Sequence, residues 1–235
     1  MATTVLIALV AGVTPLAGPV SAFAGQKPAD NWQRAFPVRA TELASSGESP
    51  YFILKPGYQL TLEGRESGKA VKLVVLVLDE TRVIDGIEAR VVEERETADG
   101  ALSEVSRNFV AIHRTTRDVY YLGEEVDVYR NGKVVGHEGA WRHGSNGATL
   151  GLLVPGSPVI GRRHSREVAP GVAMDRAQVM SVSGRITTPA GGFEKCLETE
   201  ETTPLEPGNK EYKVYAPGIG LVKDGPLVLV SYAKR

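Results

Sequence analysis

The chain has 235 residues, of which 42% are hydrophobic and 23% are charged, and its formal net charge is −1 at pH 7. A nearly neutral chain lacks the basic face that nucleic acids require, so we expect no nucleic-acid partner. The single cysteine, Cys196, excludes an intramolecular disulfide and a zinc site built from cysteines. We expect Cys196 to be buried in a strand, where a lone thiol behaves as a small apolar side chain.

The first residues are typical of an export signal. Residues 5–20 are mostly apolar and uncharged, and Ala22-Phe23-Ala24 follows with small residues at its first and third positions. No basic residue precedes this run, and a membrane anchor is the alternative, but two glycines and two prolines interrupt it. We predict a signal peptide over 1–24 and a periplasmic or secreted protein with no membrane span in the mature chain.

Residues 25–50 are predicted to form an N-terminal arm, with a short helix over 38–43 after Pro37. From residue 51 onward, short strand-like runs alternate with turn signals. The almost continuous apolar run 71–78 predicts a strand covered on both faces. Residues 144–161 are rich in glycine and proline, and they predict a long irregular loop of the kind that often carries function.

Three dipeptides, Asp85-Gly86, Asp99-Gly100 and Asn131-Gly132, each separate two strand-like runs. Such pairs favour type I′ turns, which need a positive φ at both central residues and therefore predict tight hairpins. A wider hairpin is predicted between 179–187 and 193–202. No βαβ alternation occurs. The sequence therefore predicts an all-β chain with one antiparallel domain over 51–235, built as a single curved sheet or half-open barrel of about ten strands.

Five segments have a distinctive sequence: Tyr51-Phe52-Ile53-Leu54-Lys55-Pro56-Gly57, Tyr120-Tyr121-Leu122-Gly123-Glu124-Glu125, Glu138-Gly139-Ala140-Trp141, Thr203-Pro204-Leu205-Glu206-Pro207-Gly208 and Tyr215-Ala216-Pro217-Gly218-Ile219-Gly220-Leu221-Val222. In these segments the chain resembles a family of uncharacterised exported bacterial proteins. The strand pattern is also similar to that of periplasmic lipoprotein carriers. That analogy implies a curved sheet that shelters an apolar ligand, and it concerns the fold alone.

The central hairpin can be interpreted residue by residue. A two-residue turn at Asn131-Gly132 pairs Val128 with Val135 and Val126 with His137. One face then carries these residues and, if the strand continues, Trp141 and His143. The opposite face carries three carboxylates, Glu125, Asp127 and Glu138, which form a solvated acidic face or a site for a hard cation.

We interpret the chain as a binding protein that shelters an apolar or amphipathic small molecule, or a partner's segment, on a concave sheet face. The candidate ligand-binding residues are Tyr120, Tyr121, His137, Trp141, His143 and Tyr215. The alternative is a small exported enzyme, with or without a metal, that uses acid/base groups. Its candidate residues are His137, His143, His164, Glu124, Glu167 and Asp175.

The sequence contains no nucleotide-binding, hydrolase or metalloprotease motif, so we predict no cofactor. The basic cluster Arg162–Arg166 is expected to be a solvated loop or strand end.

Overall fold

The computed structural model describes residues 31–234, so the predicted export signal lies outside the described residues. Within that range the regular structure is β-strand, and the one helical segment is the three-residue 3-10 turn η1 (Ala40–Glu42). The described part contains no helix of the length and apolarity that crossing a bilayer requires.

The strands follow one another along the chain. They are β1 (Leu43–Ala44), β2 (Gly47–Ser49), β3 (Phe52–Leu54), β4 (Tyr58–Glu66), β5 (Lys69–Ile84), β6 (Ile87–Ala98), β7 (Ala101–His113), β8 (Val119–Arg130), β9 (Lys133–Gly136), β10 (Trp141–Arg142), β11 (Thr149–Val154), β12 (Arg163–Ser165), β13 (Glu167–Val168), β14 (Arg176–Thr188), β15 (Gly191–Thr202), β16 (Glu211–Ala216), β17 (Gly220–Asp224) and β18 (Leu227–Lys234).

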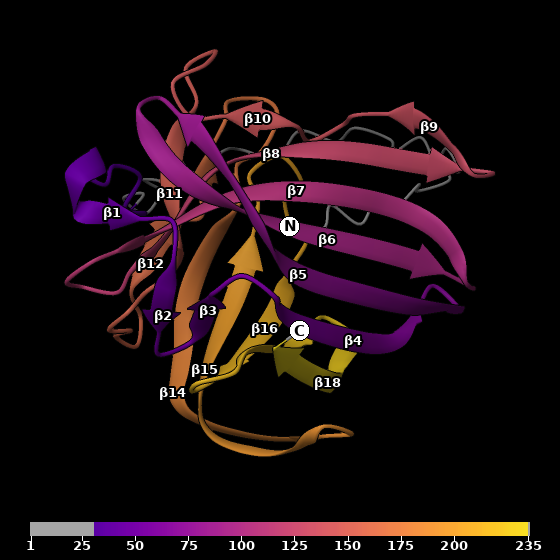
Figure 1. Ribbon diagram of the computed structural model, residues 1–235. Coiled ribbons are helices and arrows are strands. Elements are labelled where there is room, and N and C mark those ends of the chain that lie inside the picture. Colours follow the sequence, from indigo (N-terminus) through magenta and orange to yellow (C-terminus); the bar gives the residue numbers. More distant parts are fainter. Residues whose placement is uncertain (1–30, 235) are drawn as a thin grey trace, which may run out of the picture.

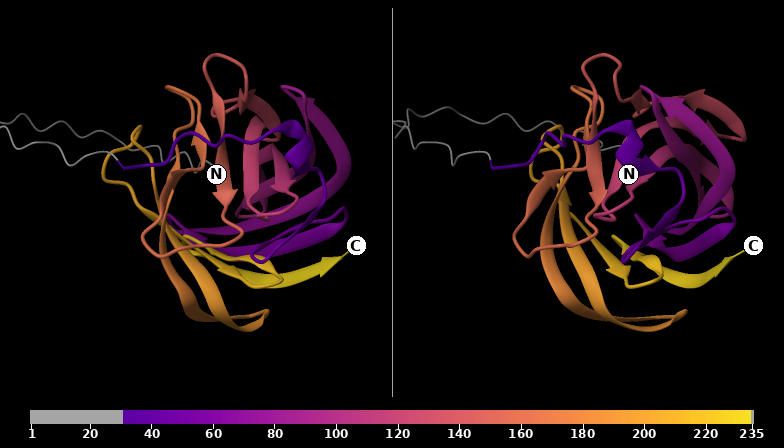
Figure 2. Two further views of the ribbon diagram at one scale, coloured as in Figure 1. Left: turned by 90° about the vertical axis from the view of Figure 1, so that its left-hand side faces the viewer. Right: turned by 60° about the vertical axis from the view of Figure 1, so that its left-hand side comes forward.

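Sixteen of these strands form one antiparallel sheet that curves into a nearly closed barrel (Figures 1 and 2). Its order is β12-β14-β15-β16-β17-β18-β4-β5-β6-β7-β8-β11-β13, with β1 beside β7 and with β9 and β10 beside β8. The remaining two strands, β2 and β3, form a separate hairpin. The all-β prediction is confirmed, but the expectation of about ten strands is wrong, since several short strands at the barrel edge carry no separate sequence signal.

The barrel closes through one short segment of chain. The two ends of the sheet, β12 and β13, are consecutive in sequence and separated only by Arg166. On one side β12 pairs with β14, and on the other β13 pairs with β11. The backbone N–H groups of Arg166 and Glu167 also donate to the carbonyl of Asp175. We call residues 163–168 the closing segment.

The three predicted tight hairpins are confirmed. Ile84 pairs with Ile87 and Ala98 with Ala101 across their two-residue turns, and Arg130 pairs with Lys133 across Asn131-Gly132. Every central residue has a positive φ, as a type I′ turn requires. The wider hairpin also forms, but β14 and β15 extend until only Pro189 and Ala190 separate them.

Two predictions of local structure are wrong. The helix over 38–43 shortens to η1, and Leu43 instead begins β1 and pairs with β7, because burial of its side chain outweighs weak helical propensity. The loop over 144–161 contains β11, which pairs with both β8 and β13. Its apolar residues are buried on both faces of the sheet, a pattern that the surrounding glycines and prolines conceal.

The predicted register of the central hairpin holds only next to the turn. Tyr129 pairs with Val134, but Val128 then pairs with Gly136, because Val135 is the extra residue of a bulge. The strand ends there, and Trp141 returns in β10 opposite Glu124. Trp141 is buried as expected, whereas the side chain of His137 is 67% exposed, so its predicted place on the same face is wrong.

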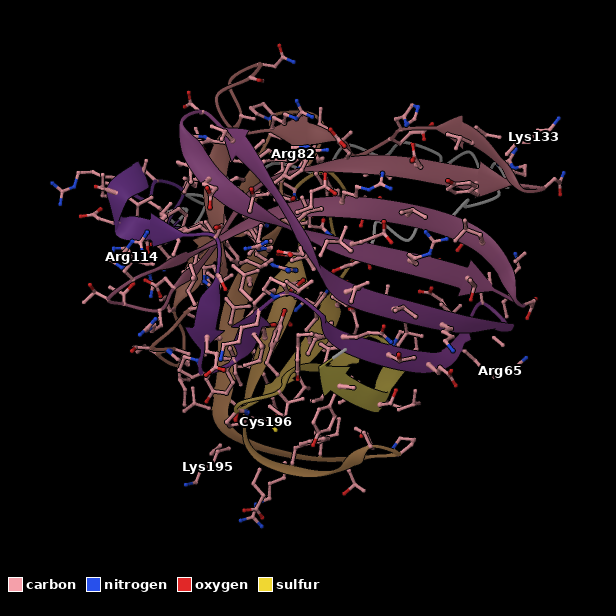
Figure 3. The ribbon with its side chains drawn as sticks, viewed as in Figure 1. Arg65, Arg82, Arg114, Lys133, Lys195 and Cys196 are labelled. Atoms are coloured by element: carbon pink, nitrogen blue, oxygen red, sulfur yellow. The ribbon has the colours of Figure 1, made fainter. Side chains whose placement is uncertain are left out.

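Two apolar clusters lie on opposite faces of the sheet. The larger fills the barrel interior and includes Leu62, Leu73, Leu197 and Cys196, which confirms that the thiol is buried (Figure 3). The smaller lies on the outer face of β6, β7, β8 and β11, where Phe36 and Val38 of the N-terminal arm cover it. In the run 71–78 every second side chain is buried, and those between are half-buried or, at Lys72, exposed, so the run is covered more fully on its interior face.

We predict that Gly151→Ala destabilises the closure of the barrel. A Cβ atom at residue 151 would lie 2.3 Å from the carbonyl carbon of Arg166, and backbone atoms of a paired segment cannot move aside cheaply. The free energy of unfolding measured in urea should fall by about 1–3 kcal/mol or more. Gly192→Ala is the matched control, because no atom lies within 4 Å of the added Cβ. Equal stability of the two variants would show that the closing segment does not lie against β11.

Candidate ligand-binding site in the barrel interior

The barrel interior contains a pocket that reaches from one open end to a polar floor. It encloses about 760 Å³ of space between atoms, mouth included, of which about 70 Å³ can hold the centre of a water molecule. Most of its lining is apolar, from strands β3 to β7 and from β11, β16 and β17. The small inner volume suits a narrow chain or a small ring rather than a bulky ligand.

The lining residues divide into a mouth and a floor. Half-buried apolar side chains form the mouth; they are Phe52, Ile53, Tyr58, Leu153, Ile219 and Leu221. Fully buried polar side chains form the floor; they are Asn108, Tyr121, Arg166, Lys213, Tyr215 and Asp224. The half-buried Glu94 also lines the pocket, so the pocket is amphipathic and most of its charged groups, but not all, lie at the floor.

Four of the buried side chains form a row of alternating charge, which we call the interior charge row: Arg166, Glu201, Lys213 and Asp224. A guanidinium nitrogen of Arg166 donates to Glu201, and the Lys213 ammonium lies 3.8 Å from the same carboxylate and donates to Asp224 at 3.0 Å. The row links the closing segment to β15, β16 and β17. Each of the four residues is more than nine-tenths buried, so each charge depends on its neighbours.

Arg166 has a donor without a partner at the pocket floor. Burial acts to lower the pKa of its guanidinium, but the nearby carboxylates, Glu201 above all, outweigh burial and hold that pKa well above its ordinary value. Within the described residues, its Nε–H finds no hydrogen-bond acceptor. The phenol of Tyr215 lies on the same floor, and burial raises its pKa further from neutrality. A charged donor beside a neutral hydroxyl is suited to an acceptor such as a carboxylate.

A second polar group surrounds Tyr121. Its hydroxyl lies within hydrogen-bond distance of both Asn108 Oδ1 and Glu124 Oε2, the latter at 3.0 Å, and the Asn108 amide donates to Ser106. One hydroxyl hydrogen cannot serve two acceptors. A protonated Glu124 resolves this, because it donates to Tyr121, which then donates to Asn108. Burial raises the pKa of Glu124 to about 7, which favours the protonated form.

Glu167 and Asp175 form a buried carboxyl pair behind the pocket. Their side chains share a hydrogen bond, and the Trp141 indole donates to Glu167 Oε2 at 3.1 Å. Burial, followed by the charge of Glu167, raises the pKa of Asp175 to about 7. Two carboxyl groups in contact favour sharing one proton. The pair is therefore a hydrogen-bonded unit that stabilises the closing segment.

The structure brings some of the predicted site residues together. Tyr121 and Tyr215 line the pocket, and Trp141 packs edge-on against Tyr121 with ring centroids 5.4 Å apart. Glu124 and Glu167 lie next to these aromatic residues through their hydrogen bonds. These side chains share one buried region although they come from β8, β10, β13 and β16.

Other predicted site residues lie outside the barrel interior. Tyr120 packs against Phe36 on the outer face. His143 accepts a hydrogen bond from the Leu150 backbone, in a groove beside the N-terminal arm. His137 is exposed and contacts Val126 and Asp127. The histidines therefore do not converge, as a shared acid/base or metal site would require.

The acidic face predicted on the central hairpin does not assemble. Glu125 pairs with Arg107 in the sheet and forms an ion pair with Arg142, while Asp127 contacts His137. Glu138 is exposed beyond the end of β9, so it never lies opposite Glu125. Among residues 31–234, no three His, Cys, Asp or Glu side chains are arranged to hold a metal ion.

His164 is fully buried in the closing segment, and neither ring nitrogen has a partner among the described residues. Burial, followed by the charges of Arg162 and Arg166, lowers the pKa of its imidazole to about 3. The ring is therefore neutral at ordinary pH and behaves as a packing group. The expectation of a solvated cluster over 162–166 holds for Arg163, which is exposed, and is wrong for His164, Ser165 and Arg166.

Sequence reasoning missed most of the pocket floor. Lys213 and Asp224 on the floor, and Glu201 beside it, were not candidates, because charged residues at alternate strand positions usually mark the wet face of a sheet. A usable signal was present: Lys213 alternates with Tyr215, and Glu201 with Thr199 and Leu197, so both strands place charge and apolar bulk on one face.

Comparisons with protein-family models, with curated proteins and with solved structures found no match to this chain.

We predict that Glu124→Gln changes how stability depends on pH. Between about pH 4.5 and 7 the folded protein keeps a proton on Glu124 that the unfolded chain has lost. The contribution of Glu124 to the free energy of unfolding is therefore complete below about pH 4.5 and declines as pH rises through this range. Glutamine keeps a donor for Tyr121 and cannot ionise. Relative to wild type, the variant should gain roughly 3 kcal/mol at about pH 8 and little at about pH 4.5.

Urea unfolding at both pH values measures this difference, with Glu138→Gln as the surface control. If Glu124→Gln and wild type lose stability in parallel as pH rises, Glu124 is ionised in the folded protein and the proposed hydrogen-bond chain is wrong.

Proposed function

We propose that this protein binds a small amphipathic molecule inside the barrel. The apolar part of the ligand lies along the mouth, against Phe52, Tyr58 and Leu221, and its polar end reaches the floor. The observation that carries the proposal is the Nε–H of Arg166, a charged donor without an acceptor among the described residues, on the polar floor of a pocket whose remaining lining is mostly apolar. A buried donor of this kind costs free energy until a ligand supplies the acceptor.

The head group that fits best is a carboxylate or a similar oxygen acceptor. Arg166 and Lys213 are the two cations of the lining, and Tyr215 adds a hydroxyl. Glu94 and Asp224 also line the pocket, so the pocket as a whole is balanced in charge and favours one acceptor group over a strongly anionic one. The narrow interior favours a single chain. The predicted export signal makes the periplasm or the cell exterior the proposed site of action.

The enzyme alternative has weaker support. Its best feature is the Glu167–Asp175 pair, whose raised pKa values suit proton transfer. Neither carboxyl group lines the interior pocket, and the three candidate histidines lie apart from the pair or are buried without a partner. Ligand carriage needs only the pocket, so it is the function that we propose.

We predict that Leu221→Trp blocks binding of a fluorescent single-chain fatty acid such as parinaric acid. Leu221 is half-buried at the mouth, so a larger ring narrows the entrance without entering the core. The dissociation constant measured by fluorescence titration should rise roughly tenfold or more. Val83→Trp is the control, since Val83 is 72% exposed at the Asp85-Gly86 hairpin.

The same titration tests the head group. A probe chain that ends in a methyl group should compete less well than the chain that ends in a carboxylate, because only the latter accepts from Arg166. Equal binding of the probe by wild type and Leu221→Trp would exclude the interior as the site. Equal competition by the two chains would exclude Arg166 as the head-group contact.

A further inference from the structure

The end of the barrel that carries the pocket mouth presents exposed apolar and basic side chains together. Val159 and Ile160 are 63% and 62% exposed at the tip of loop 155–161, and Met180 of β14 is also exposed. Arg162 and Arg163 follow in sequence, and Arg117 lies in the adjoining turn between β7 and β8. We call these six residues the rim patch.

The loop of the rim patch is fixed rather than loosely attached. The Gly156 N–H donates to Asp118 at one end, and the Gly161 N–H donates to the Val179 carbonyl at the other. Gly156 lies so close to the backbone of Thr116 and Arg117 that a Cβ atom there would overlap it. The two aliphatic side chains are thus held outward although no described residue covers them, which costs free energy unless an apolar environment receives them.

The charged side chains beside the tip are basic. Within residues 31–234, Arg117, Arg162 and Arg163 form no salt bridge; Arg162 donates to Gln33, and Arg163 donates to Gln178 and Asn31. Glu48 and Glu200 act on Arg117 and Arg163 only at longer range, and Asp118 is held by Gly156 and Thr116. An anionic surface would therefore meet guanidinium groups beside an apolar tip.

The rim patch adjoins the pocket. Strand β11 supplies Leu153 and Val154 to the pocket lining and leads directly into loop 155–161. The same end carries the turn with Arg114, whereas Arg65 and Lys133 mark the opposite end (Figure 3). A surface that receives Val159 and Ile160 would lie next to the pocket mouth.

We propose that the rim patch docks this end of the barrel on the surface of an anionic lipid bilayer. Val159, Ile160 and Met180 enter the boundary between head groups and acyl chains, and the arginines lie among the phosphates. The pocket mouth then lies beside the bilayer, where an amphipathic molecule can pass between membrane and barrel without crossing water. Docking is independent of the proposed ligand, because vesicles alone test it.

The test is co-flotation of the full chain with vesicles of phosphatidylcholine, or of equal parts phosphatidylcholine and phosphatidylglycerol. Val159→Ser with Ile160→Ser should weaken binding to the anionic vesicles roughly tenfold or more. Arg162→Gln with Arg163→Gln should weaken it about 30-fold, the change that corresponds to about 1 kcal/mol for each arginine near an anionic surface, and should reduce its sensitivity to salt.

The matched control is Val134→Ser with Val135→Ser. These valines are 44% and 54% exposed in the Asn131-Gly132 hairpin at the opposite end of the barrel. Residues 1–30 are the same in wild type and in every variant. A difference in vesicle binding between variants is therefore due to the substituted surface residues. The control should bind the anionic vesicles as wild type does.

The proposal is overturned if the Val159/Ile160 variant binds as tightly as the Val134/Val135 control, or if wild type binds both vesicles equally. Sedimentation without lipid tests the alternative that this face binds a second copy of the protein. If wild type is a dimer and the Val159/Ile160 variant is a monomer, this face is a protein interface. Failure of fatty-acid binding with normal vesicle binding would refute the proposed ligand alone.

Discussion

The structure depends on the interior charge row, which holds the two edges of the sheet together. A curved sheet that does not close leaves unpaired backbone groups at both edges. Here one short segment pairs with both edges, and its central residue, Arg166, points inward to Glu201. Lys213 and Asp224 continue the row across the neighbouring strands. Because the charges alternate, each one is stabilised by the next, and removal of any one would leave a buried charge uncompensated.

The interior charge row also makes the pocket polar at its inner end. Small barrels usually fill their interior with apolar side chains. The pocket in this interior is apolar toward its mouth, and it becomes polar beside the closing segment. Several carboxyl groups near the row, the buried Glu124 and Asp175 and the half-buried Glu211, have pKa values raised to about 7, chiefly by burial. A raised pKa reduces the negative charge on these groups, and the charges of the row are paired, so the pocket offers a ligand a polar end with little net charge.

Local chemistry made much of the fold predictable, whereas the site depends on contacts between distant strands. Asp85-Gly86 and Asn131-Gly132 specify their hairpins because turn geometry is set by the two residues themselves. Tyr121, Trp141 and Tyr215 were identified as large amphipathic side chains, and all three are buried in or beside the interior. Arg166 was not, since its burial arises only when β12 and β13 meet the two sheet edges. His137 was predicted to lie on the buried face and is exposed instead. The bulge at Val135 interrupts the strand alternation on which that prediction was based.

A double-mutant cycle on Arg166 and Glu201 tests whether their buried interaction holds the barrel closed. If the pair is a buried interaction that closes the barrel, Arg166→Met and Glu201→Met should each lower the free energy of unfolding by about 3–5 kcal/mol. The double variant should be more stable than either single variant, because two methionines leave no uncompensated charge in the pair. Losses that simply add would contradict the account, since they would mean that Arg166 and Glu201 act independently and that the barrel closes without their interaction.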